Sequence, residues 1–269
     1  MQQRIIISIV WILLIGLIIF VLPAWIFTAV VTMITALAMF EFFNMIQKKS
    51  LPVYRYFGIA VGCLLPISTY FKFEPAQGWE LLLITTLCLS VFLLQFTRRR
   101  TDNATSGIAI TMFAVFYISW FFSFLVKIRT SDLIVPDGRM MVLFLLIVTK
   151  SGDMGAYFFG KYIGVHLLIP RISPKKSIEG AVGGFLCSFL AAFLCAPLIP
   201  QIELMHISIL GILLGILGQI GDLSESLIKR DCVVKDSSTI FGNLGGMLDL
   251  VDSLLFTSPI FYFYMKFLS

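Results

Sequence analysis

The sequence predicts an all-α, polytopic integral membrane protein with about nine transmembrane helices and an intramembrane polar cavity that faces the cytoplasm. Of the 269 residues, 59% are apolar and only 13% are charged, and the mean hydropathy is +0.98, whereas a soluble domain is about half apolar. The apolar residues occur in long runs without the alternation typical of a membrane β-barrel. The positive charges are unevenly distributed between the loops, as is typical of proteins that cross a membrane several times.

Nine apolar stretches reach or approach the ~20 residues that a helix needs to cross the hydrocarbon core. They are residues 5–22, 24–46, 56–71, 79–97, 107–126, 140–164, 178–199, 205–228 and 248–267. The third is short and contains Pro66, which makes it the least typical span. The first is longer than the apolar region of a signal peptide, about 7–15 residues, and no small-x-small cleavage site follows it. We therefore expect it to be retained as the first span.

The positions of Lys and Arg predict the orientation of these spans. With nine spans, fourteen of the 20 Lys and Arg residues fall in loops on one side, five fall on the other, and Lys150 lies within a span. Cytoplasmic loops carry such an excess, so we place the first side in the cytoplasm and the protein in the inner membrane of the cell. The same distribution accounts for the net charge of +5 without a nucleic-acid partner.

The two halves of the chain differ in their polar residues. Residues 1–135 contain five predicted spans, and we interpret this half as a transmembrane scaffold. Only one acidic residue, Glu41, lies more than a turn inside a span there, and we expect it to reach water or to pair with Lys48 or Lys49. Residues 136–269 contain the other four spans and most of the intramembrane charge, so we predict that this half is catalytic.

The charged residues within the spans of the second half are Lys150, Asp153, Asp222, Glu225, Asp249 and Asp252. Each such group costs about 2.5–3.5 kcal/mol at membrane depth, so several together need pairing, water or a ligand. At 1.5 Å per residue, Asp153, Asp222 and Asp252 lie about 8–12 Å from the cytoplasmic ends of their helices. We therefore expect three helices to bring these carboxylates together in a water-filled, metal-binding cavity. The alternative is separate ion pairs within helices, Lys150 with Asp153 and Glu225 with Lys229.

Two basic loops rich in small residues are predicted at the same depth. They read PRISPKKSIEGAVGG (170–184) and KRDCVVKDSSTIFGNLGG (229–246). Lys and Arg beside backbone N–H groups of Ser, Thr and Gly can bind phosphates. Carboxylates next to such loops are typical of Mg²⁺-assisted phosphoryl or nucleotidyl transfer, although turn residues with positive-inside charges would give the same composition. Three glycine pairs spaced by four, at 58 and 62, 180 and 184, and 211 and 215, predict close helix packing.

At these residues the sequence resembles a known family. Residues 226–256, SLIKRDCVVKDSSTIFGNLGGMLDLVDSLLF, are similar to the C-terminal signature of phosphatidate cytidylyltransferases, also called CDP-diacylglycerol synthases: S-x-x-K-R-x(4)-K-D, about eight residues, then G-G-x-x-D-R-x-D. The matching residues are Ser226, Lys229, Arg230, Lys235, Asp236, Gly245, Gly246, Asp249 and Asp252. SPKKSIEGAVGG (173–184) and SGDMGAYFFGKYIG (151–164) resemble two further segments of that family. The resemblance covers about residues 140–267.

The resemblance implies the reaction of CTP with phosphatidate to give CDP-diacylglycerol and pyrophosphate, with Mg²⁺ and a second cation such as K⁺. It implies catalytic roles for Lys229, Arg230, Lys235 and Asp236. It implies substrate contacts from Ser173, Lys175, Lys176, Ser226, Gly245 and Gly246. It implies that Asp236, Asp249 and Asp252 bind metal, to which we add Asp222 because of its depth. The expected partners are the two substrates and the lipid bilayer, and the glycine-rich helix faces permit a homodimer.

The chain departs from the family pattern at two places. Gly242, Asn243 and Leu244 stand where Pro-Gly-His is common, and Leu250 stands where Arg is common. Loss of the His removes a phosphate contact or proton carrier. A phosphate monoester is already an anion at pH 7, so the reaction needs no strong base and tolerates this loss.

Three other functions are compatible with the sequence. A CTP-dependent lipid kinase would share the nucleotide but would transfer the γ-phosphoryl group. A transporter would use the Ser151–Gly152 region as the break of a discontinuous helix, although we see no inverted repeat. An inactive member of the family would account for Leu244 and Leu250.

Overall fold

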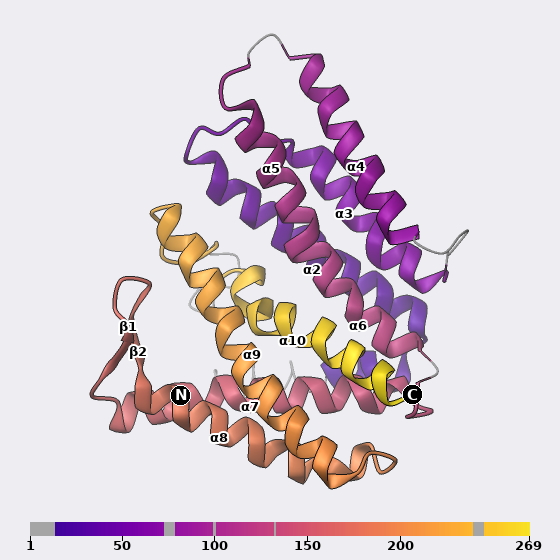
Figure 1. The fold of residues 1–269 in the computed structure, drawn as a ribbon, viewed down its shortest axis with the longest axis vertical. Coiled ribbons are helices and arrows are strands. Elements are labelled where there is room, and N and C mark those ends of the chain that lie inside the picture. The colour runs from indigo at the N-terminus through magenta and orange to yellow at the C-terminus, as the bar shows by residue number, and fades with distance from the viewer. Residues whose placement is uncertain (1–13, 73–78, 99–100, 132, 239–244) are drawn as a thin grey trace.

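The computed structural model describes residues 14–72, 79–98, 101–131, 133–238 and 245–269 (Figure 1). Long helices make up most of these residues. They are α2 (Ala24–Gln47), α3 (Arg55–Tyr70), α4 (Trp79–Phe96), α5 (Ala104–Ala114), α6 (Phe121–Thr130), α7 (Gly138–Ile163), α8 (Ile178–Leu194), α9 (Leu204–Asp231) and α10 (Met247–Leu268). A π-helical segment, Val115–Trp120, joins α5 to α6. Eight of the nine predicted spans therefore coincide with helices. The first lies partly outside the described residues, and its described end contains the π-helical turn Leu17–Val21.

The lengths and apolar character of these helices support a membrane protein. Within the described ranges, four helices are long and apolar enough to cross a membrane: Ala24–Gln47, Ala104–Thr130, Gly138–Ile163 and Leu204–Asp231. Two further apolar helices, Leu82–Phe96 and Ile178–Leu194, are shorter. A helix satisfies all its internal backbone hydrogen bonds without water, which is why it is the usual form of a chain in lipid.

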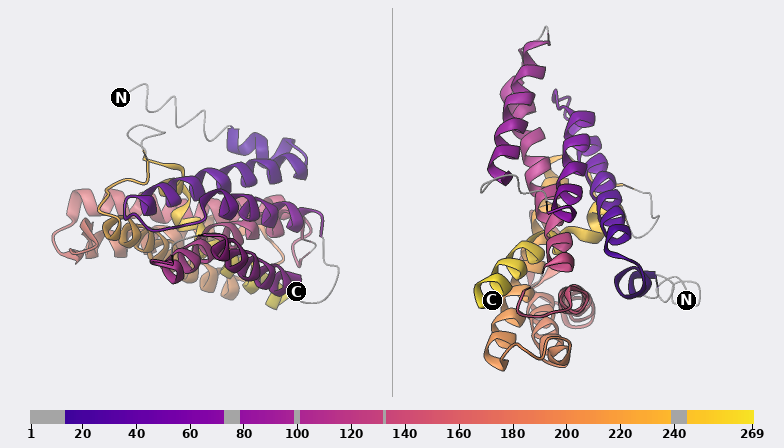
Figure 2. Two further views of the ribbon diagram at one scale, coloured as in Figure 1. Left: turned by 90° about the horizontal axis from the view of Figure 1, so that it is seen from above. Right: turned by 90° about the vertical axis from the view of Figure 1, so that its right-hand side faces the viewer.

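The helices form two groups with α10 between them. In Figure 1, α2 to α6 lie in the upper part of the molecule and α7, α8 and α9 in the lower part. Helix α10 contacts α2 and α6 in the first group and α7 and α9 in the second. The right-hand view of Figure 2 shows the same division from the side. The N-terminus of α10, which carries the acidic end of the signature, therefore lies where both groups can reach it.

The glycine pairs pack helices together as predicted. A Cβ on Gly184 of α8 would lie 2.8 Å from the carbonyl oxygen of Gly152 on α7. A Cβ on Gly58 of α3 would lie 2.8 Å from the ring of Phe43 on α2. A Cβ on Gly211 of α9 would lie 3.1 Å from Ala192 on α8. These close approaches confirm the prediction that the small residues allow close helix packing, and they place that packing within the chain.

Two expectations about local structure are wrong. The all-α prediction misses a hairpin, β1 (Leu167–Ile169) and β2 (Ser173–Ser177), whose strands are antiparallel. The segment before it is held by Glu179, which accepts hydrogen bonds from the backbone N–H groups of Val165 and His166. The break expected near Ser151 in the transporter hypothesis is also missing, because α7 is continuous from Gly138 to Ile163.

Candidate active site

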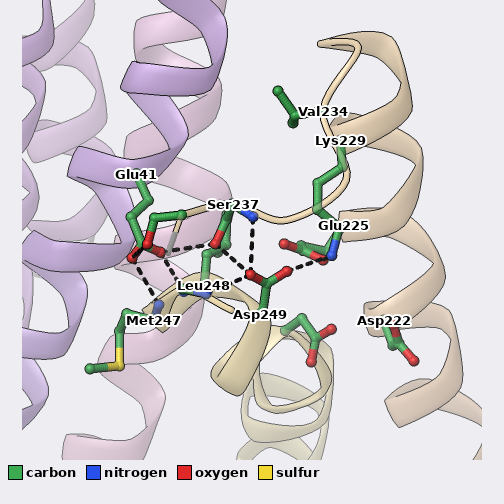
Figure 3. Close-up of polar contacts among 12 residues, drawn as sticks. Glu41, Asp222, Glu225, Lys229, Val234, Ser237, Met247, Leu248 and Asp249 are labelled. Atoms are coloured by element: carbon green, nitrogen blue, oxygen red, sulfur yellow. Dashed lines mark hydrogen bonds and ion pairs between the residues drawn. The ribbon is translucent and has the colours of Figure 1, made fainter. Parts of the chain in front are cut away.

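The N-terminus of α10 is built around Asp249. This residue occupies the third position of the helix, and its Oδ2 accepts hydrogen bonds from the backbone N–H of Gly246 at 2.7 Å and of Ser237 at 3.0 Å. The Ser237 hydroxyl donates to the same oxygen at 2.8 Å. Carboxylates at this position are favourable because they satisfy N–H groups that have no partner within the helix. Asp249 thus ties the segment after α9 to the start of α10 (Figure 3).

Lys229 links α9 to Asp249. Its Nζ lies 2.5 Å from Oδ1 of Asp249 and forms a second ion pair with Glu225, one turn earlier on α9. The Glu225 side chain is fully buried and that of Lys229 is only 11% exposed. An ammonium group between two carboxylates offsets their mutual repulsion and the cost of burying them. The ion pair of Glu225 with Lys229, which we predicted as the alternative to a shared cavity, is therefore present. It also includes Asp249 on another helix.

Two more lysines form ion pairs with carboxylates of this region. Nζ of Lys176, at the end of the hairpin, lies 2.7 Å from Oδ2 of Asp222 on α9. Nζ of Lys150 lies 2.8 Å from Oδ2 of Asp153 on the same helix, as the alternative prediction requires. Lys150 also donates to the Leu250 carbonyl at 3.0 Å and to the Ser253 hydroxyl at 2.9 Å. Lys150 therefore places a cation at the backbone of Leu250, the position at which the family commonly has Arg.

Asp252 interacts with members of both of these ion pairs. It is 6% exposed, and its Oδ1 accepts a hydrogen bond from the backbone N–H of Ser253 at 2.6 Å. Asp222, Asp153 and Lys150 all act on it electrostatically. The structure therefore brings Asp153, Asp222 and Asp252 into one polar cluster, from α7, α9 and α10. We call it the acidic cluster, and its members are the carboxylates of Asp153, Asp222, Glu225, Asp249 and Asp252 with the ammonium groups of Lys150, Lys176 and Lys229.

The other predicted site residues lie around this cluster. Lys175 is exposed on β2, and Lys235 and Asp236 are exposed after α9. Arg230 is exposed, and its Nε donates to the Ile172 carbonyl at 3.0 Å, which joins the hairpin to the end of α9. Ser173 is half-buried on β2, Ser226 is buried on α9, and Gly245 and Gly246 are buried before α10. Gly245 has a φ of 84°, a conformation that glycine adopts without strain. The residues Gly242, Asn243 and Leu244 lie outside the described residues.

Glu41 is a member of this region that the sequence reasoning misplaced. It is fully buried, and it accepts hydrogen bonds from the backbone N–H groups of Met247 and Leu248, each at 2.9 Å. The expectation that it reaches water or pairs with Lys48 or Lys49 is wrong, since Lys49 pairs with Asp231 at 2.5 Å. Its one sequence signal was its isolation, as the acidic residue set deepest in a span of the first half.

The acidic cluster fits a magnesium ion only in part. Among the residues that the structure describes, no three His, Cys, Asp or Glu side chains are placed to hold a metal ion. Mg²⁺, however, is usually held by one or two carboxylates with waters and substrate phosphates. Asp222 and Asp252 suit that role, because Asp222 acts electrostatically on Asp252 and the five carboxylates of the cluster meet only three ammonium groups. Asp249 has both oxygens occupied by other donors, and the Asp236 side chain is exposed.

A cavity of about 260 Å³ lies away from this chemistry. It is lined by apolar residues of α3, α4 and the π-helical segment, among them Leu65, Leu87 and Trp120. Its lining carries none of the predicted site residues. The polar cavity that we predicted therefore remains a prediction, and this apolar space is not evidence for it.

Comparison with known proteins identifies the family. The model of the cytidylyltransferase family matches residues 2–268. The phosphatidate cytidylyltransferase of Bacillus subtilis (strain 168) is 29% identical over 248 residues, which cover 90% of each chain. That of Staphylococcus saprophyticus is 32% identical over 231 residues, covering 81% of this chain and 80% of its own. The uncharacterized protein YnbB of Escherichia coli (strain K12) is 31% identical over 253 residues, covering 91% of this chain and 80% of its own. The match extends through both halves, including the helices before residue 140 that the motifs did not cover, and the chain belongs to the cytidylyltransferase family.

Proposed function

We propose that the protein transfers the cytidylyl group of CTP to phosphatidate. A phosphate oxygen of the lipid attacks the α-phosphorus of CTP, the bond between the α-phosphorus and its bridging oxygen breaks, and pyrophosphate leaves. The products are CDP-diacylglycerol and pyrophosphate. The names of the relatives from B. subtilis and S. saprophyticus agree with this reaction.

One observation carries this proposal: charged residues from separate motifs meet at one place. Lys176 of the first basic loop forms an ion pair with Asp222, and Lys229 of the signature forms one with Asp249. Asp222 also acts electrostatically on Asp252. These residues come from β2, α9 and α10. Hard oxygen ligands beside cations are what the transfer between two phosphates requires.

The chain's own residues would then divide the work between metal and phosphates. Asp222 and Asp252 would hold a Mg²⁺ ion, which when bound offsets the charge of the two reacting phosphates. Lys175, Arg230 and Lys235, which are exposed, and Lys176 at the edge of the cluster would bind the triphosphate and the lipid phosphate. Lys229 and Asp249 hold each other, and we assign them to fixing α9 against α10. Direct roles for Asp236, Ser173 and Ser226, and a second cation such as K⁺, remain predictions.

We also propose nine spans, with the acidic cluster opening to the cytoplasm. Contacts between loops support this topology. Lys49 pairs with Asp231, and Arg98 donates to the Pro52 carbonyl at 2.7 Å. Each contact joins loops that the charge count puts on the cytoplasmic side. Arg139, in a loop predicted on the other side, donates to the Phe20 carbonyl at 3.1 Å. Phosphatidate could then keep its acyl chains in lipid and its phosphate at the cluster.

The test is incubation of the purified protein with phosphatidate, labelled CTP and Mg²⁺. We expect labelled CDP-diacylglycerol and pyrophosphate. Phosphorylated lipid with CDP would instead identify a lipid kinase, and substrate uptake into proteoliposomes without CTP turnover would identify a transporter. No product and no uptake would favour an inactive member of the family.

A homodimer is a separate question. The glycine faces that we took to permit one pack within the chain, so they do not support it. The mass of the protein in detergent would decide between a monomer and a dimer.

A further inference from the structure

We propose that Glu41, from the first half of the chain, is a positioning residue of the active site. It fixes the N-terminus of α10 and the segment 237–238 in the arrangement that aligns Asp249 and Asp252. The inference rests on the proposed function for its effect on turnover, but its structural consequence can be measured without that function.

Four donors surround the Glu41 carboxylate. Oε1 accepts from the hydroxyl of Ser238 at 2.6 Å and from the N–H of Met247 at 2.9 Å. Oε2 accepts from the N–H of Leu248 at 2.9 Å and lies 3.1 Å from the hydroxyl of Ser237, whose single proton it shares with Asp249. All four donors lie 196 or more residues further along the chain. Figure 3 shows Glu41 reaching from α2 to the first turn of α10.

The chemistry of these contacts favours a carboxylate. The first N–H groups of a helix have no partner within it and carry partial positive charge, so a buried anion there is stabilised. Hydrogen bonds to a charged acceptor are about twice as strong as those between neutral groups. An amide in the same place offers one acceptor oxygen and turns its NH₂ toward donors. Glu41 is therefore suited to hold α10 in a way that glutamine is not.

The contacts continue from Glu41 into the acidic cluster. The Ser237 hydroxyl lies between Oε2 of Glu41 and Oδ2 of Asp249, at 3.1 Å and 2.8 Å. Asp249 in turn holds Lys229 at 2.5 Å. Asp252 follows Asp249 by three residues, nearly one turn of α10, so a displacement of the first turn would displace it too. Glu41 thus acts on the metal-binding carboxylate through the helix that carries it.

Gly246 gives further evidence that the sequence is suited to this contact of Glu41 with α10. A Cβ at this position would lie 2.1 Å from the Ser237 hydroxyl and 2.4 Å from Oε2 of Glu41. Real Cβ atoms do not approach other atoms so closely, so any other residue would displace the carboxylate or the serine. The second glycine of the signature pair thus makes room for Glu41.

The main experiment compares Glu41→Gln with Thr35→Val, a control on the same helix. Thr35 is also fully buried, but among the described residues its hydroxyl bonds only to the Val31 carbonyl of its own helix. We expect Glu41→Gln to lower kcat about ten- to a hundredfold, as expected for misplaced catalytic groups, with little change in the KM for CTP. Thr35→Val should keep kcat within about twofold of the parent protein. Equal activity of the two variants would overturn the proposal.

Two further measurements separate positioning from loss of folding. Combining Glu41→Gln with Ser237→Ala should lower kcat by less than the product of the single effects, because both remove the same link; fully multiplicative effects would contradict the proposal. Amide hydrogen exchange in residues 245–250 should be faster in Glu41→Gln than in Thr35→Val. If the parent protein makes no CDP-diacylglycerol, the proposed function fails, while the exchange result still decides whether Glu41 holds α10.

Gly246→Ala, with Gly218→Ala as its control, tests the same contact without replacing Glu41. A Cβ on Gly218 would meet nothing closer than 3.6 Å, so alanine should be accepted there. We expect Gly246→Ala to lower kcat and speed exchange as Glu41→Gln does, and Gly218→Ala to do neither. Normal turnover and exchange in Gly246→Ala would show that the site does not depend on this contact.

Discussion

The two halves of the protein differ in the polar side chains that join their helices. In α2 to α6, most buried hydroxyls bond to the carbonyl four residues earlier on the same helix, as Thr28, Thr35 and Thr111 do. In α7 to α10, charged side chains bond across helices, as Lys150 does with Ser253 and Lys176 with Asp222. A polar group satisfied within its own helix leaves that helix free to face lipid. Charges that need a second helix fix the position of that helix, which is what a site for phosphates requires.

Glu41 is an exception, because this charged side chain of the first half bonds to the second half. It lies on α2, but all its hydrogen bonds run to residues 237–248. The first half is therefore not only a scaffold, because it also supplies the anion that holds the start of α10. The following variants test how far the difference between the halves extends.

The largest effect is expected at Asp252. We expect Asp252→Asn to lower the rate of CDP-diacylglycerol formation by about 10²-fold or more, the scale on which one preorganised electrostatic group acts. The change keeps the shape of the side chain and removes its charge. Asp102→Asn, an exposed carboxylate of the first half, should leave the rate unchanged. Comparable rates for the two variants, measured with labelled CTP, would contradict the proposal that Asp252 binds a metal ion.

A large loss of stability is expected at Lys229. Lys229→Met leaves Glu225 and Asp249 buried without their cation, and breaking such a pair costs about 3–5 kcal/mol. Lys49→Met is the matched control, because the Lys49–Asp231 pair is exposed, with side chains 32% and 67% accessible. Exposed pairs contribute about 0–1 kcal/mol. Thermal unfolding in detergent would compare the two, and similar losses would contradict the assignment of Lys229 to fixing α9 against α10.

The sequence predicted the positions of the helices well for a physical reason. Backbone in lipid has few alternatives to a helix, so apolar length alone located α2, α3 and the others. The convergence of Asp153, Asp222 and Asp252 followed from equal depth, since helices that start at one membrane face bring residues at equal depth to one level. Both of these predictions depend only on distance along a helix.

Contacts that depend on how helices pack could not be predicted in this way. The pairing of Lys176 with Asp222 needs the hairpin to fold back on α9, and two short strands in a charged loop give no periodic signal. The partners of Glu41 lie about 200 residues away, so no local pattern identifies them. The capping role of Asp249, in contrast, could have been predicted from the sequence, because an acidic residue three positions after the N-cap of a helix is a known capping signal.

A moderate effect is expected where helices of the second half touch. A Cβ on Gly184 would lie 2.8 Å from the Gly152 carbonyl oxygen and 2.9 Å from the Ala156 side chain. Overpacking of this kind costs about 1–3 kcal/mol, so Gly184→Ala should lower the unfolding temperature. Gly16→Ala is the control, because a Cβ there meets nothing within 4 Å. An unchanged unfolding temperature in Gly184→Ala would show that α7 and α8 can separate without cost.

The smallest effect is expected at the start of α7, where Asp137 caps the helix. It accepts hydrogen bonds from the N–H of Arg139 at 2.9 Å and from its Nε at 3.0 Å. Burial acts to raise the pKa of Asp137, but the bonds from Arg139 outweigh it and hold the pKa below its usual value. The charged form therefore stabilises the fold at neutral pH, and this contribution is lost as the pH falls through the lowered pKa, below about 4. Asp137→Ala should cost about 1 kcal/mol at pH 7 and less at pH 3, whereas Asp137→Asn keeps a capping side chain and should cost less at pH 7. A loss in Asp137→Ala that is the same at both pH values would show that the charge of this cap, unlike that of the acidic cluster, contributes nothing.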